Sequence, residues 1–227
     1  MPRGKLIASV VFAGLAAVLA AGCNVPIGTP EERLLKAAKN NYIENIRRLL
    51  DSGVPPDVTD GAGWTPLMWA AAKDNVEAVR LLQARGARLD AKNAKGETAL
   101  HIAARWSRVE TVRYLLAAGA RPGAVDRLAW PPLMWAPLQG RTEVAAALIE
   151  GGARLEFRDT LGNTPLILAA TRGRAETVRL LLDLGANPYR VNKAGQSAAA
   201  AARQSGYPEL AAALEAAGAE RPRARRK

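Results

Sequence analysis

The chain has 227 residues, of which 49% are hydrophobic and only 5% aromatic, a composition that suits one folded domain with a core of leucine, valine and alanine. It contains one cysteine and one histidine, His101, too few for an intramolecular disulfide, a His/Cys metal site or a nucleophilic triad. The formal net charge is +11, but five positive charges lie in the last seven residues and two more at Arg3 and Lys5, which leaves +4 for residues 23–220. This composition argues against an enzyme.

The first 22 residues have the layout of a secretory signal peptide. Arg3 and Lys5 precede an uncharged apolar run from Leu6 to Ala21, and small residues follow it. The run is short for a membrane span, which needs roughly 20 apolar residues. We therefore expect residues 1–22 to be a signal peptide, with an uncleaved anchor as the alternative.

The stretch LAAGC, Leu19 to Cys23, resembles a bacterial lipobox, in which the signal is cut before the cysteine and the cysteine is lipidated. The leucine lies one place early, and Ala20 occupies the position it usually holds. The resemblance implies lipid on Cys23, a lipidated N-terminus and linker over residues 23–29, and an anchor in the cell envelope facing the periplasm. Asn24 after the cysteine implies the outer rather than the inner membrane. An ordinary cleaved signal with an incidental cysteine is the alternative.

A period of 33 residues runs through the rest of the chain. WTPLMWA begins at Trp64 and WPPLMWA at Trp130, with TALHIAA from Thr98 between them and TPLILAA from Thr164 after them. Glycine, glutamate and leucine recur at the same spacing through six copies, and the last of these glycines is Gly218. The period predicts six units with the approximate bounds 30–59, 60–92, 93–125, 126–158, 159–191 and 192–219.

Each unit contains two apolar stretches at helical spacing, which are too short to form stable helices alone. A threonine and a proline open the first stretch and suit the N-cap and the first helical turn, at Thr65, Pro66, Thr98, Thr164 and Pro165. The recurring glycine after the second stretch suits a left-handed C-cap. Between units, Asp or Asn followed by glycine predicts a tight hairpin turn.

These motifs resemble the ankyrin repeat, whose signature is a TPLHxAA turn and helix, an LLxxGA end to the second helix and a 33-residue period. The resemblance covers about residues 30–219. It implies an all-α repeat solenoid, an ankyrin-repeat stack of about six helix-turn-helix units with projecting hairpin loops. His101 holds the signature histidine, and the resemblance implies that it hydrogen-bonds within its own turn.

The resemblance also implies a non-catalytic module that binds a protein partner through its concave face and hairpin tips. Trp69 and Trp135 share a position inside the first helices, where we expect plain packing. Tryptophan and arginine are enriched among the residues that dominate binding energy. For Trp64, Trp106 and Trp130, ordinary partial burial within the fold is the alternative to a partner contact. The candidate contact residues are Trp64, Lys73, Arg105, Trp106, Trp130, Gln139 and Arg172.

The fourth unit departs from its neighbours. Ala129 replaces the hairpin glycine, Pro131 replaces the capping threonine, and Pro137 falls inside the first helix. An interior proline removes a hydrogen bond and costs about 3 kcal/mol or more. We therefore expect a shortened or kinked helix there, and a place where the solenoid bends or grips its partner.

Residues 220–227 end in RPRARRK and are predicted to be a disordered basic tail. Such a tail can contact anionic lipid with about 1 kcal/mol per basic residue, whereas the export signal argues against nucleic acid. The sequence has no phosphate-binding glycine loop, paired carboxylates or metal-ligand spacing, so we expect no cofactor and no small-molecule substrate. The alternative functions are an envelope-associated structural protein whose tail contacts lipid or polymer, and an immunity or regulatory protein.

Overall fold

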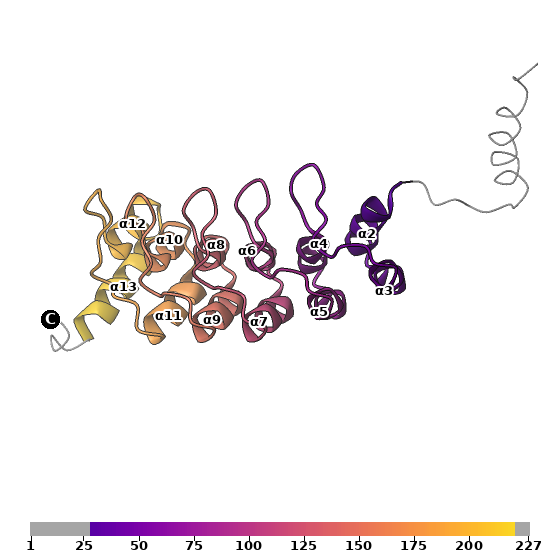
Figure 1. Ribbon diagram of the computed structural model, residues 1–227. Coiled ribbons are helices and arrows are strands. Elements are labelled where there is room, and N and C mark those ends of the chain that lie inside the picture. The colour runs from indigo at the N-terminus through magenta and orange to yellow at the C-terminus, as the bar shows by residue number, and fades with distance from the viewer. Residues whose placement is uncertain (1–27, 221–227) are drawn as a thin grey trace, which may run out of the picture.

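The computed structural model describes residues 28–220, which form a row of helix pairs (Figure 1). The predicted signal peptide, Cys23 and the tail from Arg221 onward lie outside the described residues. The described span contains twelve α-helices, and its only bridge of the β type joins Val191 to Ser197. The all-α repeat stack predicted from the sequence is therefore confirmed. None of these helices is long and apolar enough to cross a membrane.

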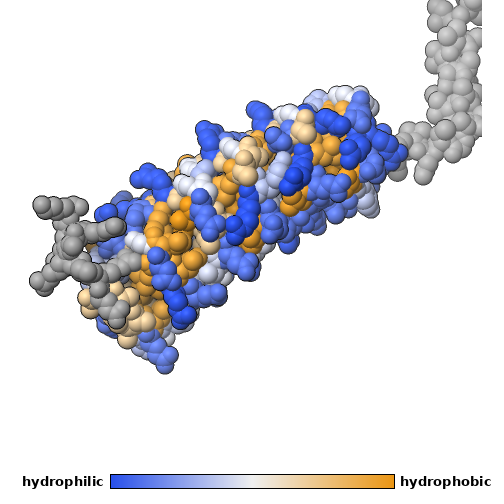
Figure 2. Space-filling model, turned by 90° about the horizontal axis from the view of Figure 1, so that it is seen from below, coloured by the Kyte–Doolittle hydropathy of each residue, from blue (hydrophilic) through white to orange (hydrophobic). Residues whose placement is uncertain are grey.

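The first helices of the pairs form one layer and the second helices another, and the hairpins between units project beyond the first layer (Figure 1). Viewed from the side of the second helices, hydrophilic residues cover much of the surface, interrupted by hydrophobic bands that cross the stack (Figure 2). The first helices are α2 (Pro30–Lys39), α4 (Pro66–Ala72), α6 (Ala99–Arg105), α8 (Pro132–Gln139), α10 (Pro165–Thr171) and α12 (Ala198–Gln204). The second helices are α3 (Ile43–Asp51), α5 (Val76–Ala84), α7 (Val109–Ala117), α9 (Thr142–Glu150), α11 (Ala175–Asp183) and α13 (Pro208–Glu220).

Local hydrogen bonds set where the first helices begin. The hydroxyls of Thr65, Thr98 and Thr164 each accept a hydrogen bond from the backbone N–H three residues later. These N–H groups have no partner inside the helix, so each threonine satisfies one of them. Pro131 takes this place before α8 and supplies no such bond.

The recurring glycine after the second helix does not act alike in every unit. From Gly53 to Gly185 its φ is positive, between 88° and 100°, as a left-handed cap requires. At Gly218 the helix continues instead to Glu220. A Cβ at Gly218 would lie 3.1 Å from the ring of Tyr189, whose hydroxyl donates a hydrogen bond to the Gly218 carbonyl. In the last unit, glycine therefore makes room for a tyrosine rather than ending a helix.

The predicted shortening of the helix at Pro137 is wrong. Helix α8 has eight residues, whereas α4, α6, α10 and α12 have seven each. Proline here removes only the one bond that would reach back four residues to Leu133, and its ring is buried in the core. Gly140 then ends the helix at φ +70°, with its N–H donated to the carbonyl of Pro137 at 3.2 Å.

The buried apolar residues form two clusters rather than one. The first extends from Leu34 to Ala153 and the second from Leu166 to Leu214. Ile149 is partly buried and packs against both. The boundary between the two clusters falls between the fourth and fifth helix pairs, α8–α9 and α10–α11, although α8 and α10 still pack against each other there.

The hairpins show a break at the same place. Neighbouring hairpins are joined by backbone bonds from Ala94 to Ala62, from Arg127 to Lys95 and from Lys193 to Leu161, at 2.9–3.0 Å between N and O. Among the described residues, no hydrogen bond joins hairpin 125–130 to hairpin 158–163.

A single methyl group explains the missing bond. At the hairpin glycines Gly63, Gly96 and Gly162, a Cβ would lie 3.0 Å from the backbone N of the next hairpin. Ala129 occupies the equivalent position and carries such a Cβ, at φ +59°. The next hairpin cannot approach closely enough to form the backbone bond, and the alanine holds a left-handed conformation that costs about 1–2 kcal/mol.

We predict that Ala129→Gly stabilises the protein by about 1 kcal/mol, because glycine adopts positive φ without strain and admits the hairpin bond. Urea unfolding followed by circular dichroism measures the change in the free energy of unfolding. Ala62→Gly, at a hairpin position without positive φ, is the matched control and should not stabilise. Equal effects of the two substitutions would contradict this explanation of the break.

Candidate functional site

One aspartate and two tryptophans form a compact cluster at the hairpin that opens the second unit. Asp60 Oδ1 accepts hydrogen bonds from the backbone N–H groups of Ala62 and Trp64, both at 2.9 Å. Asp60 Oδ2 accepts a third from Nε1 of Trp69 at 3.2 Å, and the two indole rings lie 4.4 Å apart between centroids. The carboxylate therefore fixes both the hairpin turn and an indole on α4.

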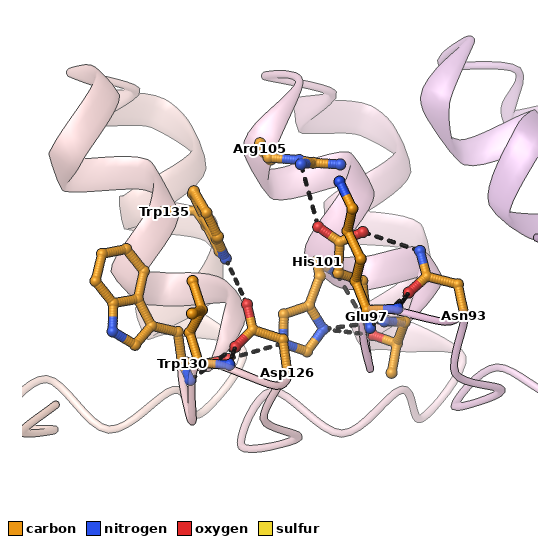
Figure 3. Close-up of polar contacts among 10 residues, drawn as sticks. Asn93, Glu97, His101, Arg105, Asp126, Trp130 and Trp135 are labelled. Carbon is orange, nitrogen blue, oxygen red and sulfur yellow. Dashed lines mark hydrogen bonds and ion pairs between the residues drawn. The ribbon is translucent and has the colours of Figure 1, made fainter. Parts of the chain in front are cut away.

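The hairpin that opens the fourth unit repeats this cluster with Asp126, Trp130 and Trp135 (Figure 3). Nε1 of Trp135 donates to Asp126 Oδ2 at 3.1 Å, and the two rings meet edge to face at 5.0 Å. Trp69 and Trp135 thus do more than pack, because each satisfies a carboxylate oxygen that the turn leaves free.

Between the two tryptophan pairs, the third unit carries a buried ion pair. Glu97 takes the place of Trp64 and Trp130 in the repeat and is only 3% exposed. Its Oε1 lies 3.2 Å from Nη1 of Arg105, and its Oε2 accepts a hydrogen bond from the amide of Asn93 at 2.9 Å (Figure 3). Such burial is tolerable for a carboxylate only with a paired charge and hydrogen bonds.

His101 joins the third unit to the fourth. The backbone N–H of Thr98 donates to Nδ1 at 3.2 Å, so the neutral ring carries its proton on Nε2 and donates it to the Trp130 carbonyl at 3.0 Å (Figure 3). Burial, which disfavours the charged imidazolium, is the largest cause that lowers the pKa of His101 from its ordinary value of 6.5. The histidine bonds within its own turn and also holds the backbone at Trp130.

A hollow of about 690 Å³, open to solvent, lies between the hairpins and the C-terminal ends of the first helices in the second to fourth units. Its lining combines two indoles, three cations and one amide, and we call it the tryptophan–arginine hollow. The lining residues are Trp64, Lys95, Arg105, Trp106, Gln139 and Arg141.

Four of the seven candidate contact residues meet in the hollow, namely Trp64, Arg105, Trp106 and Gln139. The other three lie elsewhere. Lys73 and Arg172 are exposed residues at the ends of α4 and α10, and Trp130 is partly buried against Trp135.

Sequence reasoning missed Lys95 and Arg141. Lys95 lies at a hairpin tip where the neighbouring units have Ala62 and Leu128, so no recurrence marked it. Arg141 belongs to a recurring arginine position directly before the second helix, which also includes Arg108 and Arg174. That recurrence was a signal that the sequence offered.

The arrangement is suited to attracting anions and packing apolar groups. Arg105 shares its charge with Glu97, and the side chains of Lys95 and Arg141 have no hydrogen-bond or ion-pair partner in the described part of the chain. Trp106 is 43% exposed. Over residues 28–220, no group of three or more His, Cys, Asp or Glu side chains is placed to hold a metal ion.

Fold and surface together define a helical repeat protein with an aromatic and cationic hollow beside its hairpins. The family model for ankyrin repeats (three copies) matches residues 34–126 and again residues 133–221. The chain therefore belongs to the ankyrin-repeat family, whose members are typically non-catalytic protein–protein interaction modules. No relative among the curated proteins matches the chain.

The lowered pKa of His101 predicts a stability that depends on pH. The unfolded chain binds this proton more readily than the folded one, so stability is full above the unfolded pKa of 6.5 and is lost as pH falls below it. For one proton the loss is at most about 1.4 kcal/mol per pH unit. Urea unfolding at pH 7.5 and pH 5.5 measures it.

His101→Met is the control, since Met68 and Met134 hold the same place in other units. This variant has no histidine left and should lose most of the pH dependence between pH 7.5 and 5.5. An unchanged pH dependence in His101→Met would show that another group is responsible.

Proposed function

We propose that this protein is an exported, lipid-anchored and non-catalytic interaction module that binds a partner protein through its concave face. The observation that carries the proposal is the tryptophan–arginine hollow, in which four residues selected from sequence as contact candidates come together. Tryptophan and arginine at the centre of an interface contribute most of the binding energy in many complexes.

Trp106 is the residue whose removal tests this surface most cleanly. Among residues 28–220, its indole makes no ring contact or hydrogen bond, whereas Trp64 packs on Trp69 with ring centroids 4.4 Å apart. Its exposed indole, at the end of α6, is free to be covered by a partner.

We predict that Trp106→Ala weakens partner binding by about ten-fold or more, as expected for a residue that dominates binding energy. The full chain, affinity-tagged and expressed in its native cells, is isolated from the envelope after brief cross-linking, and the partner is quantified by mass spectrometry. Tyr42→Ala removes an aromatic that is 53% exposed and does not line the hollow, so it is the matched control. Equal recovery of the partner with both variants would rule out this face.

The export part of the proposal is supported by the signal-peptide layout of residues 1–22 and by a lone cysteine at Cys23 within LAAGC. Acyl chains contribute about 0.8 kcal/mol per buried methylene, so more than one chain anchors a protein stably. The orientation proposed is toward the periplasm, at the outer membrane.

We predict that Cys23→Ser abolishes incorporation of labelled fatty acid and moves the protein from the membrane to the soluble fraction. Cell fractionation and metabolic labelling measure the two effects. A Cys23→Ser protein that stays firmly in the membrane would indicate an uncleaved anchor, and a labelled one would exclude Cys23 as the lipid site.

A further inference from the structure

We propose that the tryptophan–arginine hollow binds an acidic segment of the partner protein that also carries an aromatic or aliphatic side chain. This inference rests on the proposed partner-binding function and adds the chemistry of the bound segment.

Charge is the first argument. Three cations line the hollow, and no carboxylate lines it. The nearest compensating group, Glu97, is only 3% exposed and is already held by Arg105 and Asn93. Lys95 and Arg141 therefore give the hollow an unbalanced positive charge of about two, which favours a partner of opposite charge.

The third cation, Arg105, is held in a fixed orientation by its neighbours. Its Nη1 faces Glu97 at 3.2 Å from Oε1, and its guanidinium carbon lies 5.7 Å from the centre of the Trp135 ring. The guanidinium is thus held in one orientation from two sides, and a guanidinium held in this way loses little entropy when it binds a carboxylate.

The two indoles of the hollow favour an apolar side chain in the bound segment. Trp64 and Trp106 line the same hollow as the cations, and Trp106 is 43% exposed. A purely polyanionic ligand would leave these rings in water, whereas a segment with an apolar side chain would bury them at about 25 cal/mol per Å² of apolar surface. The combination favours a mixed acidic and apolar segment.

Neither residues 1–27 nor residues 221–227 supply such a segment. Residues 1–27 and 221–227, which lie outside the described part, contain no aspartate or glutamate, and both carry basic residues. The segment is therefore expected to come from another molecule.

Arg105 is unsuitable as the test residue, because its removal leaves Glu97 buried without a counter-charge and the variant can fail to fold. Lys95→Gln with Arg141→Gln removes both unbalanced charges without breaking a hydrogen bond of either side chain. Lys193→Gln with Arg179→Gln is the matched control, since it removes one exposed hairpin lysine and one exposed helix arginine away from the hollow.

The probe is a random dodecapeptide library displayed on phage and selected on the immobilised full chain. We expect the retained peptides to have a net negative charge and at least one aromatic or aliphatic residue. Fluorescence anisotropy of a labelled selected peptide then measures affinity. Binding should weaken by about ten-fold for Lys95→Gln/Arg141→Gln, while the control pair stays within about two-fold of the parent. Binding of the parent protein should weaken by a similar factor when the acidic residues of the peptide are replaced by their amides. The same is expected when its apolar residues are replaced by serine.

Several results would overturn the inference. The selection could retain no peptides, or only neutral or basic ones. The double variant could bind the selected peptide as tightly as the parent protein does. The peptide with serine in place of its apolar residues could bind as tightly as the original peptide. Full competition by inorganic polyphosphate, which has no apolar or aromatic group, would indicate a general polyanion site and would also count against the inference. Loss of the native partner with Trp106→Ala, but no preference for acidic peptides, would leave the proposed function standing and remove only this chemistry. Undiminished partner capture with Trp106→Ala would instead remove the proposed function.

Discussion

The first helices of units two to six have only seven or eight residues, and the second helices before the last have nine. Helices of this length are not stable in water, because the cost of forming the first turn is not recovered over two turns. Each helix pair therefore depends on apolar contact with the pairs on either side, and the core extends along the stack instead of closing around a centre. The distance between neighbouring helix pairs must therefore be short enough for their apolar side chains to pack, or none of these helices is stable.

That spacing also sets how closely the hairpins approach one another. Glycine at the tip allows one backbone to lie within hydrogen-bond distance of the next, and Ala129 prevents this between the hairpins at 125–130 and 158–163. The helices remain packed across this junction, where α8 contacts α10 and α9 contacts α11. The tryptophan–arginine hollow uses residues from Trp64 to Arg141, all on the N-terminal side of this junction, where neighbouring hairpins are joined by backbone hydrogen bonds.

Much of the fold was predictable because it is encoded locally and repeated. The threonine caps, the Asp or Asn turns and the 33-residue period each need only a few neighbouring residues to be recognised. The expected shortening at Pro137 failed because an interior proline removes only its own N–H bond, here to Leu133, and this loss alone does not end the buried helix. At Gly218 the sequence could not reveal the ring of Tyr189, which comes from the preceding unit.

The candidate site was less predictable because it depends on side chains from three units. A period places residues side by side, but it does not say which side chains pair and which stay free. Trp130 turned out to lie against Trp135, while Lys95 and Arg141 entered the hollow without having been selected. The pairing of Glu97 with Arg105, at the two ends of α6 in the same unit, depends on the rotamers of both side chains, which the sequence does not give.

The central claim, that the partner lies on the concave face over the hollow, is tested most directly by site-specific photo-cross-linking in intact cells. A photoreactive phenylalanine at Gln139, which lines the hollow, is compared with one at Arg179, an exposed position on α11 that does not line it. Our account predicts one cross-linked partner from position 139 and none from position 179. Cross-linking from position 179 alone, or equally from both positions, would contradict it.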